Sequence, residues 1–263
     1  MSESYTHFLD HNQSQQHNSV AHYEFQGQKV WLKKATKRHS TWIYLPLRWT
    51  ARILGLHMLV PVPNLGGNTA ILCEINRIQE LGRLGIRIPK ILAARDDAFL
   101  MLDAAAQGAQ VSQLEHALKH QVNTSAKLDL YARAIQALSD IHSKNTYLSE
   151  AFARNILVDD TYNFSFIDFE TDPAQVLSLQ DCQTRDWLCF IFSTARCFEL
   201  NELNQAKTLL LSALESNPQA YQDICKVADK LKWILKLKPE KLGSDGVRLK
   251  KCIYLLTQMR ART

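Results

Sequence analysis

Two side chains that suit a metal ion border a predicted hairpin. Residues 156–158 and 164–169 are short apolar runs, and the polar residues 159–163 join them in a turn rich in Asp and Asn, which is typical of a β-hairpin. Asn155 precedes the first run and Asp168 lies near the end of the second, so the hairpin would bring them to the same end. Either residue alone is ordinary in a turn. Together, an amide oxygen and a carboxylate suit Mg²⁺, a hard ion that keeps several waters and shares phosphate oxygens.

The residues around this pair resemble a known catalytic loop. Residues 141–170 are similar to the catalytic loop and metal-binding segment of the protein-kinase-like superfamily in its compact bacterial form. The matching residues are Ile141-His142, Tyr147, 154–158 (RNILV) and 166–170 (FIDFE). The separation of Asn155 from Asp168, 168 − 155 = 13, is also the one that kinases use. The chain departs from the family where His-Gly-Asp is expected, because Leu148-Ser149-Glu150 stands there.

Two further segments narrow the resemblance. Residues 166–173 (FIDFETDP) and residues 84–92 (LGIRIPKIL) resemble bacterial lipopolysaccharide core kinases, the heptose and Kdo kinases. The resemblance implies an α+β, two-lobed protein-kinase-like fold. In that fold, residues 21–102 would form a small β-rich N-lobe with one main helix, and residues 103–263 a larger helical C-lobe. The polar composition of residues 1–20 predicts a flexible arm before them.

A lysine at the end of a predicted strand suits nucleotide phosphates. Residues 22–35 (HYEFQGQKVWLKKA) indicate two strands around a turn at Gly27. The second strand resembles the Val-x-x-Lys strand that carries the ATP-orienting lysine of kinases. Strand alternation places Trp31 and Lys33 on one face, with Leu32 and Lys34 on the other. The motif favours Lys33, and Lys34 stays open as the alternative. No GxGxxG loop precedes the strand.

A carboxylate on an apolar helix face requires a partner. A helix is predicted from about residue 69 to residue 83, and Glu74 lies within its apolar stripe (Ile71, Leu72, Ile75, Ile78, Leu81). An unpaired buried carboxylate is costly, and the resemblance supplies Lys33 as its partner. Residues 99–103 are predicted to form a buried strand that leads into a connector, residues 104–110. The resemblance implies that the backbone of this connector binds adenine. It also implies that Asp186 caps the catalytic loop from beneath, through the backbone amides of the loop. Beyond about Ser112 the pattern is helical.

The resemblance implies an ATP- and Mg²⁺-dependent phosphotransferase. Lys33 would hold the nucleotide phosphates, Glu74 would orient Lys33, and Asn155 and Asp168 would hold magnesium. Glu150 would accept the proton of the substrate hydroxyl, and Arg154 would neutralise developing charge.

Two other functions stay open. A pseudokinase would keep the fold as a nucleotide-binding or partner-binding module, and both the loop at residues 148–150 and the missing glycine loop favour it. A protein Ser/Thr kinase is the third reading, although no Ala-Pro-Glu motif follows Asp168.

Composition favours a cytoplasmic protein. The 263 residues are 46% hydrophobic and 22% charged, and the formal net charge is +5, all ordinary values for a globular chain. The six cysteines form no CxxC pattern, so we interpret them as reduced. The N-terminal residues lack the features of a signal peptide, and no apolar run is long enough to span a membrane.

Two segments bear on partners. Residues 42–59 are apolar with two tryptophans and no acid, and we weigh core packing on the small lobe against an interfacial element at an anionic membrane. The C-terminal portion is rich in lysine, which fits solvated helix faces, anionic lipid or a phosphorylated sugar. The expected acceptor is a sugar or a lipid-linked saccharide, with peripheral association on the inner membrane as an option. No nucleic acid is expected, because the aromatic residues are not interleaved with the basic ones.

Overall fold

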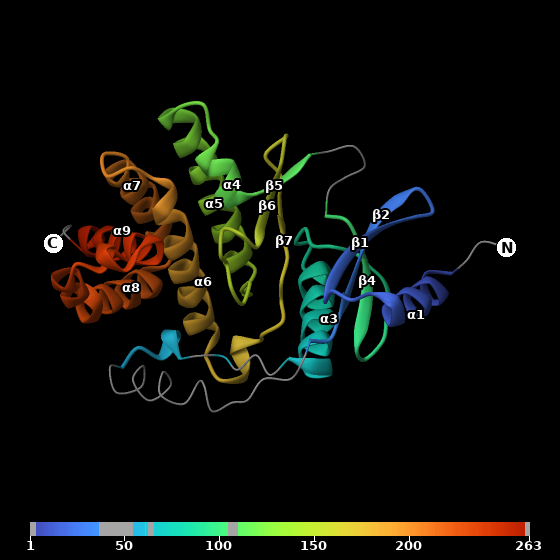
Figure 1. The fold of residues 1–263 in the computed structure, drawn as a ribbon. Helices are drawn as coiled ribbons and strands as arrows, with labels where there is room; N and C mark the ends of the chain where they lie inside the picture. The colour runs from blue at the N-terminus through green and yellow to red at the C-terminus, as the bar shows by residue number, and fades with distance from the viewer. Residues whose placement is uncertain (1–3, 37–54, 61, 63–65, 105–109, 261–263) are drawn as a thin grey trace.

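The computed structural model describes residues 4–36, 55–60, 62, 66–104 and 110–260. It is a mixed α+β structure in which a small antiparallel sheet and its helices stand at one end and a larger helical part at the other (Figure 1). We call residues 4–104, except for 55–62, the sheet part and residues 110–260 the helical part. The division agrees with the α+β class expected from the sequence.

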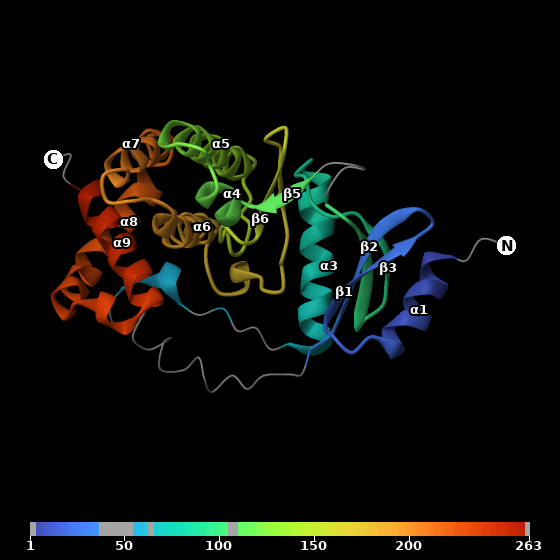
Figure 2. The same ribbon diagram turned by 45° about the horizontal axis from the view of Figure 1, so that its top comes forward.

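The sheet part is a four-stranded antiparallel sheet between two helices. Its strand order is β1-β2-β4-β3, and the tight β1–β2 turn places Gln26 and Gly27 at positive φ (53° and 71°). Helix α1 covers one face and α3 the other (Figure 2). The elements are α1 (Tyr5–Gln15), β1 (Val20–Phe25), β2 (Gln28–Lys34), α3 (Gly67–Arg83), β3 (Ile91–Ala94) and β4 (Ala98–Leu102).

Alternation along the strands assigns side chains to the two faces. In β2, Val30 and Leu32 are fully buried in a cluster with residues of α1. Phe99 of β4 points the other way and belongs to the main core, together with Ile71, Ile75, Ile78 and Leu81 of α3. Leu72, expected in the same apolar stripe, is instead 41% exposed. Lys33, between Leu32 and Lys34 in β2, therefore lies on the α3 face, as the sequence predicts.

Helix α1 corrects one expectation from the sequence. The flexible arm expected for residues 1–20 is wrong for its described residues, because Tyr5–Gln15 form a helix. Ser4 caps it by accepting a hydrogen bond from the His7 N–H at 3.2 Å. Phe8 and Leu9 are buried against the sheet. Burying these two side chains offsets the cost of ordering a polar segment.

The helical part begins with a second, three-stranded sheet. Its order is β5-β6-β7, all antiparallel. Strand β5 was not expected, since helix was predicted from about Ser112; the helix α4 begins two residues later, at Leu114. The elements are β5 (Val111–Gln113), α4 (Leu114–Lys119), α5 (Thr124–Ser143), β6 (Ile156–Asp159), β7 (Phe164–Phe166) and η3 (Pro173–Gln175).

The remaining helices pack around a core that is continuous with the sheet part. Buried side chains of α3 and Phe99 belong to the same cluster as those of α5, α6, α7, α8 and α9. The elements are α6 (Leu179–Thr194), η4 (Ala195–Cys197), α7 (Leu203–Leu214), α8 (Pro218–Leu231), η5 (Lys232–Leu237), η6 (Pro239–Leu242) and α9 (Ser244–Met259). In the described part of the chain, no helix is both long and apolar enough to cross a bilayer.

The predicted hairpin is present as β6 and β7. Ile156 pairs with Phe166 and Val158 with Phe164. Asp159 orders the turn, because its Oδ1 accepts hydrogen bonds from the backbone N–H groups of Thr161 (2.9 Å) and Asn163 (2.8 Å).

The apolar segment at residues 42–59 is described only at its end. Residues 42–54, with both tryptophans, lie outside the described residues. Leu56 and Met58, on either side of the start of η2 (His57–Leu59), are buried in the main core. Arg185 of α6 donates to the carbonyl oxygens of Met58 (3.3 Å) and Val60 (3.4 Å). The described end of the segment therefore packs against α6, in the helical part.

Candidate functional site

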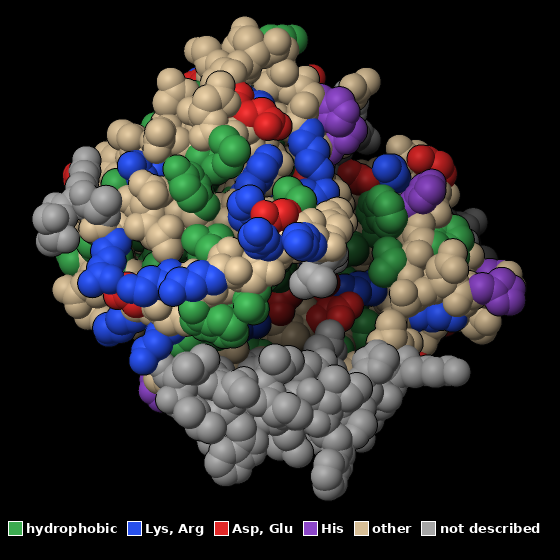
Figure 3. All heavy atoms as spheres, turned by 60° about the vertical axis from the view of Figure 1, so that its left-hand side comes forward, with side chains coloured by type: hydrophobic (Ala, Val, Ile, Leu, Met, Phe, Trp, Pro, Cys, Tyr) green, Lys and Arg blue, Asp and Glu red, His purple; other side chains and the backbone are tan. Residues whose placement is uncertain are grey.

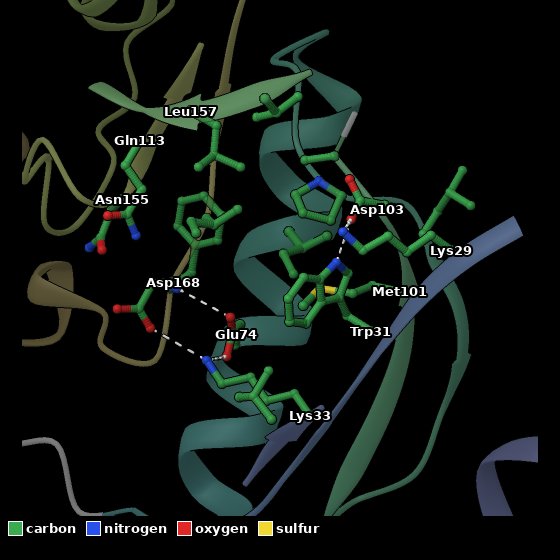
Figure 4. A pocket seen from close by; sticks show the side chains of 18 of the residues that line it. Lys29, Trp31, Lys33, Glu74, Met101, Asp103, Gln113, Asn155, Leu157 and Asp168 are labelled. Carbon is green, nitrogen blue, oxygen red and sulfur yellow. Dashed lines mark hydrogen bonds and ion pairs between the residues drawn. The ribbon is translucent and has the colours of Figure 1, made fainter. Parts of the chain in front are cut away.

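A cavity of about 780 Å³ lies between the sheet part and the helical part. Figure 4 shows side chains converging on it from β2, α3 and the β6–β7 hairpin. One region of its wall is apolar (Val20, Ile78, Pro89, Met101, Leu102, Val111, Leu157, Ile167), and the other carries charged and amide groups (Lys33, Glu74, Arg154, Asn155, Asp168). Lys29, Asp103, Gln110 and Gln113 add further polar groups to the wall. A pocket of this size that combines apolar surface with placed polar groups is typical of a small-molecule site.

Lys33 is the centre of the polar region. Its Nζ lies 2.6 Å from Glu74 Oε2, 2.9 Å from Glu170 Oε1 and 3.4 Å from Asp168 Oδ1 (Figure 4 draws the first and third). The Lys33–Glu74 pair expected from the sequence is thus formed. Lys34 donates instead to the backbone oxygen of Gln16, at the end of α1. Of the two candidate lysines, only Lys33 reaches the cavity.

Burial and charge oppose each other at this pair. Burial alone would lower the pKa of Lys33, but the carboxylates of Glu74, Asp168 and Glu170 outweigh it and raise that pKa above its usual value. Burial raises the pKa of Glu74, whose side chain is 2% exposed, and the Lys33 ammonium opposes this shift. The ammonium is therefore held charged beside the cavity.

Asn155 and Asp168 meet at the same end of the hairpin, as predicted. The Ile167 N–H donates to the Asn155 backbone oxygen at 3.0 Å, and both side chains line the cavity. The Asn155 Nδ2 donates to the Glu150 carbonyl at 3.2 Å, which leaves its amide oxygen as a ligand atom. Asp168 has φ 72°, a left-handed conformation that Asp tolerates better than most residues.

The side-chain oxygens of Asn155 and Asp168 suit Mg²⁺ that is also bound by phosphate, rather than a metal ion held by protein ligands alone. Within the described ranges, no group of three or more His, Cys, Asp or Glu side chains could hold a metal ion. An amide oxygen and one carboxylate match the few protein ligands that Mg²⁺ takes when it also binds phosphate.

The two residues with expected catalytic roles differ in position. Arg154 lines the cavity, with its guanidinium 4.7 Å from the centre of the Phe152 ring. Glu150 lies beside the cavity, and its Oε1 is 3.6 Å from Arg185 Nη2. Burial raises the pKa of Glu150, Asp168 adds to that effect, and the cations Arg185 and Arg154 oppose it.

A buried aspartate supports the loop that carries Glu150, as the sequence suggested. Asp186 is fully buried and accepts the Leu148 N–H at 2.5 Å. Its Oδ2 also lies 3.2 Å from the Nε2 of His142. The next residue after Leu148, Ser149, has φ 77°. Hydrogen bonds therefore hold the loop before this left-handed residue, at the Leu148 N–H, and after it, at the Glu150 carbonyl that accepts from Asn155.

Several residues of the site were missed in the sequence. Glu170 is the third carboxylate on Lys33, and Trp31 donates to Asp103 Oδ2 at 2.6 Å at the far end of the cavity. The connector to which adenine binding was assigned is described only at Ala104 and Gln110, because 105–109 lie outside the described residues. Glu170 follows Asp168 by two positions, a spacing that in a continuing extended run would have placed both on one side.

A second missed cluster joins α3 to the loop. Arg77, one turn after Glu74 in α3, is 3% exposed and donates to the Tyr147 carbonyl at 2.6 Å. Its guanidinium also lies 4.1 Å from the Tyr147 ring centre, and the Tyr147 hydroxyl donates to Asp172 at 2.5 Å. The helix that carries Glu74 is thereby fastened to the loop that carries Glu150.

No protein-family model matches this sequence, and no curated protein matches it either. The function is therefore inferred from the residues that line the cavity and the loop beside it.

Proposed function

We propose that the protein is an ATP- and Mg²⁺-dependent phosphotransferase with a two-lobed protein-kinase-like fold, similar to the lipopolysaccharide core sugar kinases. The observation that carries the proposal is the polar end of the cavity. There the Lys33 ammonium, held 2.6 Å from Glu74, lies beside Asp168, and Asn155 lines the same wall. Positioning and charge neutralisation are what phosphoryl transfer mainly requires.

Each residue then has a task that suits its surroundings. Lys33 would bind nucleotide phosphates, and Glu74 would keep it aimed at them. The Asn155 amide oxygen and the Asp168 carboxylate would hold Mg²⁺, which supplies charge neutralisation at the phosphates when bound. The adenine ring would bind against the apolar wall, which includes Met101, Leu102 and Leu157.

Glu150 would act on the acceptor. It would take the proton of the acceptor hydroxyl as that oxygen forms its bond to phosphorus, and ADP would leave. The raised pKa of Glu150 makes its carboxylate a stronger proton acceptor than an ordinary glutamate. Arg154, at the cavity wall, would neutralise charge that develops in the transition state. The proposed acceptor is a sugar or lipid-linked saccharide at the cytoplasmic leaflet.

A pseudokinase is the second candidate, and one observation favours it. The Glu150 carboxylate faces Arg185 and is absent from the cavity lining among the described residues. A base must come within hydrogen-bond reach of its proton, so Glu150 would have to turn from Arg185 toward the acceptor. If it does not, the cavity serves binding alone.

Transfer of labelled γ-phosphate to lipopolysaccharide core acceptors tests the proposal. We expect Glu150→Gln to lower the transfer rate by about 10²- to 10⁴-fold with nucleotide affinity unchanged, and Glu150→Asp to retain part of the rate. Glu24→Gln, at an exposed position of β1, is the matched control and should transfer as wild type does. Wild-type protein that binds ATP without transferring to any acceptor would favour the pseudokinase. A Glu150→Gln variant as fast as wild type would exclude Glu150 as the base.

A further inference from the structure

The segment after α8 exposes large apolar side chains among lysines. Helix α8 continues into η5, in which no residue is buried. Trp233 is 54% exposed and Leu237 is 65% exposed. Single exposed hydrophobic residues are common on protein surfaces. Two of this size within five residues, one of them a tryptophan, make this segment a candidate contact surface.

The charge around these two side chains is mostly positive, although Asp229, just before the segment, lies 3.6 Å from the Nζ of Lys232. Residues 230–241 (KLKWILKLKPEK) contain five lysines and a single acid, Glu240. The acid is engaged by Lys250 of α9, 3.0 Å away. The side chains of Lys230, Lys236, Lys238 and Lys241 are exposed. Figure 3 shows Lys and Arg side chains gathered beside hydrophobic ones on the face that carries the C-terminal helices.

The segment is held in place on the body of the protein. Lys238 ends η5 in a left-handed conformation (φ 51°), and Pro239, which begins η6, is buried. Helix α9 packs against both η5 and η6. Because α9 packs against the backbone of this segment, the exposure of Trp233 and Leu237 does not result from an unpacked stretch of chain.

We propose that residues 230–241 form a docking surface for an anionic lipid membrane. Trp233 and Leu237 would enter the boundary between headgroups and acyl chains, while the lysines would meet lipid phosphates. Charge complementarity selects this partner, because lysine is depleted in protein–protein interfaces. Nucleic acid would match the lysines and the Trp233 ring but would give Leu237 no apolar environment. None of residues 230–241 lines the cavity, so the proposal is independent of the phosphotransferase activity.

Co-sedimentation with vesicles tests the docking surface. The full-length protein is mixed with vesicles of phosphatidylcholine, with or without phosphatidylglycerol, in the absence of nucleotide. We expect binding only to the anionic vesicles, and weaker binding at high salt because exposed charges are screened. The pair Lys230→Gln and Lys236→Gln should lower the partition coefficient by about fivefold per lysine. The pair Trp233→Ser and Leu237→Ser should lower it by at least about tenfold.

Matched variants separate this surface from general charge and stickiness. Leu200→Ser removes an apolar side chain of similar exposure, 63%, at another site. Arg83→Gln with Lys90→Gln removes two charges from exposed positions of the sheet part. Both controls should bind vesicles as wild type does, and circular dichroism should show all variants folded.

Several different results would overturn the proposal. They are no binding to anionic vesicles, equal loss in the Arg83–Lys90 pair, unchanged binding after replacement of Trp233 and Leu237, and binding of single-stranded RNA but not of vesicles. A pair Trp42→Ser and Trp49→Ser that alone abolishes binding would move the membrane contact to residues 42–59 and also overturn it.

Discussion

At the scale of single residues, Lys33 and its three carboxylates define the site. The ammonium has two carboxylate oxygens within 3.0 Å, those of Glu74 and Glu170, and Asp168 slightly farther off. One positive charge among three negative ones leaves the Lys33 cluster with an excess of negative charge, and Arg154 adds one positive charge to the same wall. A divalent cation at Asp168 would offset this excess, so the cluster suits a ligand that arrives as a magnesium complex.

Lys33 and Lys34 provide a matched pair for testing the nucleotide lysine. We expect Lys33→Met to weaken ATP binding strongly and to lower the free energy of unfolding by about 3–5 kcal/mol, because Glu74 would remain buried without its partner. Lys34→Met, which removes a lysine from the opposite face of the same strand, should leave ATP affinity unchanged. Calorimetric titration and chemical denaturation measure both quantities. Equal loss of affinity in the two variants would contradict the assignment of Lys33.

The pH profile of phosphoryl transfer tests the role of Arg185. A base acts when deprotonated, so the rate should fall as the pH drops through the pKa of Glu150. Burial raises that pKa and the Arg185 cation opposes the rise, so Arg185→Gln should raise the pKa further and move the acidic limb to higher pH. Arg87→Gln, at an exposed arginine paired with Asp159, should leave the limb in place. If the acidic limb of the Arg185→Gln variant is unchanged or moves to lower pH, the titration of Glu150 does not determine that limb.

At the scale of elements, the β6–β7 hairpin and helix α3 position the site. The hairpin places Asn155 and Asp168 at its open end, and its turn is closed by Asp159. Helix α3 presents Glu74 to the cavity and Arg77 to the loop, one turn apart. A change in the tilt of α3 would therefore disturb Lys33 and the Glu150 loop together.

Helix α1 makes a prediction about stability. Leu9 is fully buried between α1 and the sheet, so Leu9→Ala should lower the free energy of unfolding by about 2–5 kcal/mol. Thr6→Ala, at an exposed position of the same helix, should change it by about 0.5 kcal/mol or less. Urea denaturation measures both. A Leu9→Ala variant as stable as wild type would mean that residues 5–15 are a loose arm after all.

Local sequence patterns predicted the helix and strands that carry the site. The features that were not predicted depend on contacts between residues far apart in the sequence. The β6–β7 hairpin, the α3 helix and the side of β2 that carries Lys33 all follow from apolar period and alternation. Helix α1 was missed because Tyr5, Phe8 and Leu9 are its few apolar residues in a polar stretch. Glu170 contacts Lys33 from the loop after β7, and Arg185 of α6 contacts Glu150 on the loop before β6. No local pattern specifies the paths of these two loops.

At the scale of the whole molecule, the cavity lies between the sheet part and the helical part, which share one hydrophobic core. The main apolar cluster extends from α3 and Phe99 to α9, so the sheet part is joined to the helical part by packing. Strand β2 ends at Lys34, and the N–H of Gly67, the first residue of α3, donates to the Thr36 carbonyl at 3.0 Å. Between these points, Leu56 and Met58 lie in the same core. The two walls of the cavity are thus held together on more than one side.

The thermal unfolding of the protein with and without Mg²⁺-ATP tests the nucleotide site most directly. A ligand that binds only the native state stabilises it by mass action, by about 2.7 kcal/mol at a concentration of about 100 Kd. For a chain of this size, that corresponds to a rise in Tm of about 5–10 °C. We predict such a rise with Mg²⁺-ATP, a smaller one with ATP and a chelator, and no magnesium-dependent part in Asp168→Asn, which keeps a residue that tolerates the left-handed backbone. An unchanged wild-type melting curve at millimolar Mg²⁺-ATP would contradict the nucleotide site.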